Sequence, residues 1–111
     1  MQNVSIHQQL QKHDEAAREW LDAQYLADQL REAKNDVFAR ITSEQEGGSN
    51  AEKERKARLT QDWQDYRKSM VDAEDKARRA RFWMKQKSME FDGMRSMNAA
   101  NRANMNAGSM A

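Results

Sequence analysis

The sequence predicts an all-α protein: an antiparallel two-helix coiled-coil hairpin that associates with itself into a helical bundle. Two observations carry this prediction. Each half of the 111-residue chain holds a stripe of apolar residues at alternating four- and three-residue spacing, and a glycine pair separates the halves. Such spacing is typical of a coiled-coil seam, and a short connection makes consecutive helices antiparallel neighbours.

The first expected element is a helix within residues 1–46 that begins near residue 5. Ser5 followed by Gln8 forms a weak capping pair at its start. Seven of its eight stripe positions are apolar, and these positions are Ala16, Trp20, Ala23, Ala27, Leu30, Lys34, Val37 and Ile41. The exception, Lys34, is expected either over the indole of Trp63 or reaching past the seam into solvent.

A tight turn is predicted at residues 47–50. Gly47 and Gly48 can end a helix in the left-handed conformation. Ser49 followed by Glu52 is a capping box, so the next helix is expected to start at once. A loop of about four residues leaves the two helices no room to be anything but antiparallel neighbours.

The second expected helix covers residues 51–98. Ten of its eleven stripe positions are apolar, and these positions are Leu59, Trp63, Tyr66, Met70, Ala73, Ala77, Ala80, Met84, Lys87, Phe91 and Met94. Folding the chain about the glycine pair places Trp20 opposite Ala77 and Val37 opposite Leu59. The predicted seam contains Trp20, Leu30, Val37, Ile41, Leu59, Trp63, Tyr66, Met70, Met84 and Phe91.

Residues 99–111 form a tail rich in Met, Asn and Ala, and they are expected to be partly helical or disordered. Helix is expected to persist to about residue 98–104. No acidic residue follows Asp92, and Gly93 weakens the helix by about 1 kcal/mol relative to Ala. The tail is read either as a frayed terminus or as a segment that becomes ordered on a partner.

Composition excludes several classes of protein. The chain has no Cys, which rules out disulfides, thiolate zinc sites and cysteine nucleophiles. It has no apolar run of about 18 residues and no apolar signal core, so we expect no membrane span and a cytoplasmic location. Residues 1–46 hold five basic and nine acidic side chains, whereas residues 50–92 hold twelve and nine, so the halves should attract each other.

Motifs for chemistry are missing from the sequence. There is no glycine-rich phosphate loop, and His7 and His13 lie six residues apart, on different faces of a helix. The carboxylates are plentiful but solvated, and a two-helix rod offers no deep pocket that would perturb them. We therefore expect no enzymatic activity, no catalytic residue, no metal site and no cofactor.

A second, outward stripe is the candidate site. Val71, Phe82 and Met89 point away from the seam, with Arg78 and Lys85 beside them. These five residues are called the docking face below. Aligned exposed apolar side chains suggest a second packing partner, either another copy or a foreign protein. Met94 and Met97, in the methionine-rich stretch up to Met105, form a second predicted contact region.

The stretch from Lys76 to Lys87 is an alternative site for nucleic acid. It has no acidic residue and six cations, which are Lys76, Arg78, Arg79, Arg81, Lys85 and Lys87. Phosphates would need these cations, and Phe82 could stack on a base, whereas Trp83 is expected to be partly buried beside the seam. The same cations could instead pair with acidic residues near the start of the first helix, which are Asp14, Glu15 and Glu19.

The segment from Ala77 to Arg102 resembles small helical accessory proteins from the early, recombination region of tailed bacteriophages. The pattern that carries the resemblance is Ala77, Arg81, Lys87, Phe91, Arg95-Ser96 and Ala100-Asn101-Arg102. The resemblance implies a bacterial host cytoplasm and an accessory or inhibitory role that works by docking on a nucleic-acid-processing or defence complex. It assigns no functional residue.

The sequence thus favours a non-catalytic protein-binding hairpin that forms a homo-dimer or larger assembly. Two alternatives stay open. One is a nucleic-acid-binding accessory protein of phage recombination or replication that uses residues 76–87. The other is a structural rod in an assembly.

Overall fold

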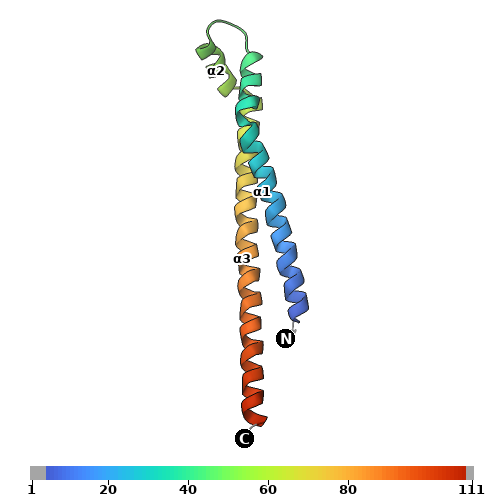
Figure 1. Ribbon diagram of the computed structural model, residues 1–111. Coiled ribbons are helices and arrows are strands. Elements are labelled where there is room, and N and C mark those ends of the chain that lie inside the picture. The colour runs from blue at the N-terminus through green and yellow to red at the C-terminus, as the bar shows by residue number, and fades with distance from the viewer. Residues whose placement is uncertain (1–4, 110–111) are drawn as a thin grey trace. The chain divides into compact units, whose positions relative to one another are not determined.

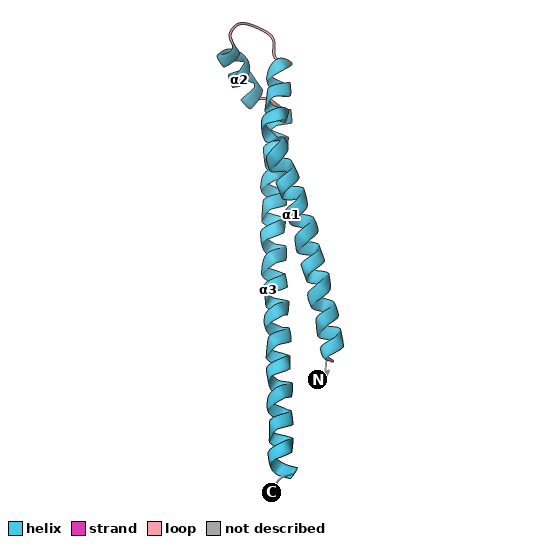
Figure 2. Ribbon diagram, in the orientation of Figure 1, coloured by secondary structure: helices cyan, strands magenta, loops and turns pink. Residues whose placement is uncertain are grey.

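The computed structural model describes residues 5–109, with side-chain surroundings for residues 5–105, and it is all-helical. Its helices are α1 (Ile6–Ser43), α2 (Asn50–Arg58) and α3 (Gln61–Ser109), and residues 5–109 contain no strand (Figures 1 and 2). The chain divides into two compact units. The central unit is Leu21–Arg78, and the terminal unit combines the residues up to Trp20 with those from Arg79 onward.

The predicted capping pair at Ser5 forms with both of its hydrogen bonds, and the predicted capping box at Ser49 forms with one of its two. At the start of α1, the Gln8 backbone N–H donates to Ser5 Oγ at 3.2 Å, and the Ser5 N–H donates to Gln8 Oε1 at 3.1 Å. At the start of α2, Ser49 Oγ accepts from the Glu52 N–H at 3.3 Å. Each contact satisfies backbone donors that have no partner within the first helical turn.

The turn after α1 uses one glycine in the predicted conformation. Gly47 has φ +97°, in the left-handed region that favours glycine. Helix α1 ends at Ser43, before the predicted residue 46. Ser43 Oγ donates to the Arg40 carbonyl at 2.6 Å, a local bond that competes with continued helix. Lys56 Nζ then donates to the Glu46 carbonyl at 2.9 Å and ties the loop to α2.

The second predicted helix is interrupted at Leu59 and Thr60. Thr60 Oγ1 accepts from the Trp63 N–H at 3.2 Å and so caps α3, while its hydroxyl donates to the Ala57 carbonyl at 2.6 Å. The interruption shifts the phase of the helix. Ala57 is fully buried, and Leu59 is 73% exposed. The prediction that Leu59 lies in the seam opposite Val37 is therefore wrong.

The core of the central unit lies where α1, α2 and α3 meet. Ile41, Ala57 and Trp63 are buried there, and Val37, Phe38 and Tyr66 pack against them. The ring of Trp63 lies 4.8 Å from that of Phe38 and 5.8 Å from that of Tyr66, between centroids. Phe38, rather than Lys34, is the α1 side chain that meets Trp63, and Lys34 is exposed, as the alternative interpretation expected.

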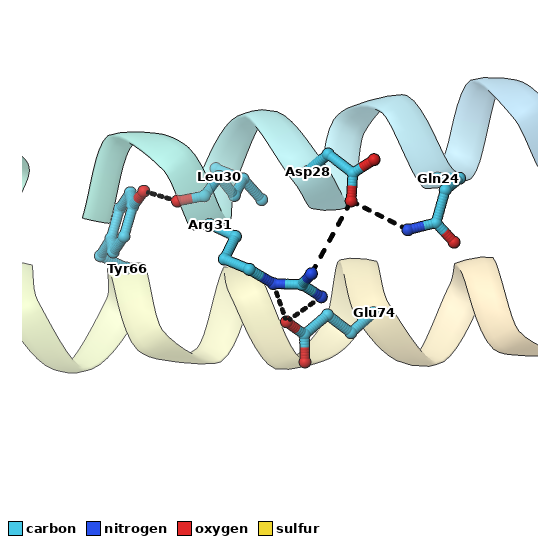
Figure 3. A network of polar contacts seen from close by, with 6 residues as sticks. All are labelled: Gln24, Asp28, Leu30, Arg31, Tyr66 and Glu74. Atoms are coloured by element: carbon cyan, nitrogen blue, oxygen red, sulfur yellow. Dashed lines mark hydrogen bonds and ion pairs between the residues drawn. The ribbon is translucent and has the colours of Figure 1, made fainter. Parts of the chain in front are cut away.

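Polar contacts join α1 to α3 in the central unit (Figure 3). The Tyr66 hydroxyl donates to the Leu30 carbonyl. Arg31 reaches Glu74 at 3.1 Å, and it also lies 3.9 Å from Asp28 on its own helix. These ion pairs are exposed, so they set register more than they add stability.

Burial follows the predicted apolar stripes. Every stripe position except Lys34 and Leu59 is buried or half-buried, from Ala16 to Ile41 and from Trp63 to Met94. The seven fully buried side chains among the described residues all lie in the central unit, and five are alanines: Ala23, Ala27, Ala57, Ala73 and Ala77. The described part of the terminal unit has only half-buried and exposed side chains.

Helix α3 is longer than predicted. It runs through to Ser109, whereas the expected limit of helix was residue 98–104, and residues 110–111 of the predicted tail lie outside the described residues. From residue 99 to residue 105 every side chain is exposed, whichever way it points around the helix. This stretch gains no tertiary packing from the described chain.

Two glycine substitutions should shift stability in opposite directions. Gly93→Ala should stabilise the protein by about 1 kcal/mol through helix propensity, because a Cβ there meets nothing within 4 Å. Gly47→Ala should destabilise it by about 1 kcal/mol, because its φ of +97° strains an L-residue. Urea unfolding followed by circular dichroism measures both, and equal signs for the two variants would contradict this account.

Truncation of Ile41 and of Leu59 should have different effects on stability, because Ile41 lies in the core and Leu59 lies exposed at the interruption between α2 and α3. Ile41→Ala should cost about 2–4 kcal/mol, because Ile41 is almost fully buried beside Trp63. Leu59→Ala, at an exposed position, should change the free energy of unfolding by less than about 0.5 kcal/mol. Comparable losses of unfolding free energy for the two variants in chemical denaturation would show that Leu59 is buried in the seam after all.

Candidate protein-docking face

Large apolar side chains of α3 face solvent in the terminal unit. Phe82 is 59% exposed and Met89 is 67% exposed, both on the outward side expected for the docking face. Trp83 is 58% exposed, and its ring stands edge-on to that of Phe82 at 6.4 Å between centroids. The seam position Met84 is half-buried and lies on the other side of the helix from Phe82 and Met89, so a single helical layer leaves Phe82 and Met89 exposed.

Trp83 is the functional candidate that sequence reasoning missed, since it was expected to be partly buried beside the seam. It borders an open groove of about 290 Å³ in the terminal unit, together with Glu15, Ala16 and Glu19 of α1. Lys87 Nζ lies 5.9 Å from the Trp83 ring centroid and 3.2 Å from Glu90. The sequence signal for an exposed Trp83 is weak: Trp83 directly follows the outward-facing Phe82 and precedes the stripe residue Met84.

Most cations of the stretch from Lys76 to Lys87 already have partners. The Arg81 guanidinium lies 5.9 Å from the Trp20 ring centroid. Arg78 lies 3.9 Å from Asp75, and Arg79 also has an interaction within the chain. With Lys87 engaged as described, Lys76 and Lys85 are the two exposed cations for which no such contact exists among the described residues.

The predicted contact residues are divided between the two units. Phe82, Lys85 and Met89 belong to the terminal unit, whereas Val71 and Arg78 belong to the central unit, and all five are exposed. Of the second contact region, Met97 is exposed, but Met94 is half-buried and belongs to the seam stripe. Met94 is therefore a poorer contact candidate than the sequence suggested.

The surroundings of these residues are open to solvent. The grooves are shallow and open, and no group of three or more metal-ligating side chains gathers within the described residues. Within the same part of the chain, no helix is long and apolar enough to cross a bilayer. What the outward face of α3 offers is apolar area rimmed by cations.

Comparison of the chain with known protein families, with curated proteins and with solved structures finds no match.

Proposed function

We propose that this protein is a non-catalytic protein-binding helical hairpin, and that Phe82 and Met89 are the anchors of its docking face. The carrying observation is that both side chains stay more than half exposed while Arg81 and Lys87 beside them cover aromatic rings of the same unit. Full burial of such a side chain contributes about 1.5–3 kcal/mol. Apolar anchors with a cationic rim are what tight protein interfaces use.

Nucleic-acid binding through residues 76–87 is the less favoured alternative. It would require several of the engaged cations to leave their rings or carboxylates and turn to phosphates. The exposed ion pairs are weak, but the ring contacts also shield apolar surface that would then face solvent. Protein docking requires no such rearrangement.

The resemblance to phage accessory proteins suggests the kind of partner. On that basis we propose a bacterial protein within a nucleic-acid-processing or defence complex, met in the host cytoplasm. In the absence of this partner, a second copy of the chain covers the same apolar residues, which gives a homo-dimer or larger bundle. An open-ended structural rod is the remaining alternative.

We also propose that α1 and α3 run antiparallel, as the two arms of a coiled-coil hairpin. Three contacts in the central unit support this arrangement, because Leu30 meets Tyr66, Arg31 meets Glu74 and Phe38 meets Trp63. In the terminal unit, Trp20 meets Arg81. Phe38, late in α1, meets Trp63, early in α3, whereas Trp20, earlier in α1, meets Arg81, later in α3, which is the behaviour of a chain that doubles back.

Charge introduced at the anchors should abolish partner capture. We expect Phe82→Asp/Met89→Asp to lose the proteins that the tagged wild type retains from nuclease-treated bacterial lysate, because a carboxylate cannot be buried without a partner. The same variant should sediment as a monomer where the wild type self-associates. Far-UV circular dichroism should show unchanged helicity.

A matched control is Leu21→Asp/Tyr25→Asp, which alters two α1 side chains that are 60% and 67% exposed. This control should keep the captured proteins. Capture that survives Phe82→Asp/Met89→Asp, or that disappears with nuclease, would reject the docking face. A molar mass from light scattering that keeps rising with protein concentration would favour the open-ended structural rod.

Spin labels at Ala16 and Ala80 should test the hairpin. If the helices are antiparallel, a labelled chain diluted with unlabelled chain should give one short inter-label distance by double electron–electron resonance. A single continuous helix would separate these residues by about 96 Å at 1.5 Å per residue. Loss of the short distance on dilution would show instead that the two helices pair between molecules.

A further inference from the structure

The terminal unit contains a second open groove, at the start of α1. Its volume is about 590 Å³, and Ile6 of α1 and Phe91, Asp92, Arg95, Ala99 and Arg102 of α3 contribute to its lining. Phe82, Trp83 and Met89 are not among its residues. The groove is therefore separate from the docking face, and it is called the arginine groove below.

The arginine groove lies where α3 loses its packing partner in the described chain. Ile6 is the first residue of α1, while α3 continues through Ser109 with every side chain from 99 to 105 exposed (Figure 1). An unpacked helical end of this kind is marginal in water. A helix laid along it would supply the tertiary contacts that α1 supplies elsewhere in the terminal unit.

Two arginines in this groove have guanidinium N–H donors that are available to a ligand. Arg95 and Arg102 are seven residues apart, so they lie on one side of α3, about 10.5 Å apart along its axis. The Arg95 guanidinium lies 5.8 Å from the Phe91 ring centroid, a contact that uses the ring face and leaves N–H groups available. Neither arginine has a hydrogen bond or ion pair among the described residues, and no acidic residue follows Asp92 in the sequence.

We propose that the arginine groove binds an amphipathic helix of another protein that presents two carboxylates seven residues apart with an apolar residue between them. The carboxylates pair with Arg95 and Arg102, and the apolar side chain packs on Ala99 beside Phe91 and Ile6. Arginine–carboxylate pairs of this kind give both attraction and orientation. The binding mode is that of a helix in a groove.

Charge and apolar content decide against other occupants. A polyphosphate strand would leave the apolar side chains of Ile6 and Phe91 without apolar contacts, whereas an amphipathic helix covers them. The exposed end of a second copy of α3 carries Arg102 and no carboxylate, so two such ends repel each other. In α1, Glu15 and Asp22 have the required spacing, but between them stand charged residues, Arg18 and Glu19.

The test uses the full chain and a synthetic probe. The probe is an alanine-based helical peptide of about 20 residues with two glutamates seven residues apart and a leucine midway. We expect it to bind the wild type in a fluorescence-anisotropy titration. A peptide of identical composition with the glutamates five residues apart, on different helix faces, should bind at least tenfold more weakly.

Charge reversal in the arginine groove should change which probe peptide the protein binds. Arg95→Glu/Arg102→Glu should weaken the glutamate probe at least tenfold and should bind the same peptide with lysines in place of the glutamates. The matched control Arg55→Glu/Arg67→Glu reverses two exposed arginines of the central unit and should stay within twofold of the wild type. If the reversed charges reduce helicity, Arg95→Gln/Arg102→Gln should weaken the probe in the same direction.

Other outcomes would overturn the proposal. Equal binding of the two glutamate peptides, equal weakening by both pairs of substitutions, or no binding of the probe at all would do so. Binding of a single-stranded oligonucleotide in place of the peptide, lost in Arg95→Glu/Arg102→Glu, would assign the groove to phosphate. A wild-type dimer that this variant makes monomeric would assign it to a second copy. Phe82→Asp/Met89→Asp should leave probe binding intact, so the two proposed surfaces fail or hold separately.

Discussion

Small side chains along the apolar stripe control how closely α1 and α3 approach in the central unit. Ala23 and Ala27 on α1, and Ala73 and Ala77 on α3, are buried there. Without large side chains between them, helix backbones can come near each other. The Tyr66 hydroxyl reaches a backbone carbonyl of α1 in the same unit. The bulkier contacts of Trp63, Phe38 and Ile41 are gathered at the core beside α2. The register of the central unit depends on this division between small and large side chains.

The terminal unit follows the same stripe but buries less. Its described part lacks a fully buried side chain, and its cations cover rings, as Arg81 covers Trp20 and Lys87 covers Trp83. Regions with few buried contacts open more easily than the core of a protein. Both proposed surfaces, the terminal part of the docking face and the arginine groove, therefore lie on the part of the chain that stands to gain most from a partner.

The heptad spacing and the caps could be predicted from sequence because they rest on local geometry. The stripe from Trp63 to Met94 and the Ser5 and Ser49 caps needed no tertiary information. The interruption at Thr60 was missed, because one threonine inside an otherwise continuous stripe is a weak signal beside strong helix formers. Trp83 was misplaced for another reason: at 100° per residue, a neighbour of the stripe can fall on either edge. The docking residues stay a prediction, since the chemistry of a partner is not written in this chain.

A set of buried side chains that are mainly alanine has a thermal consequence. The heat-capacity increment of unfolding grows with the apolar area that unfolding exposes, at about 0.45 cal/mol/K for each Å². Five of the seven buried side chains are alanines, so this chain exposes little such area for its length. We therefore expect a flatter stability curve than that of a globular domain of the same length with a core of leucine and phenylalanine.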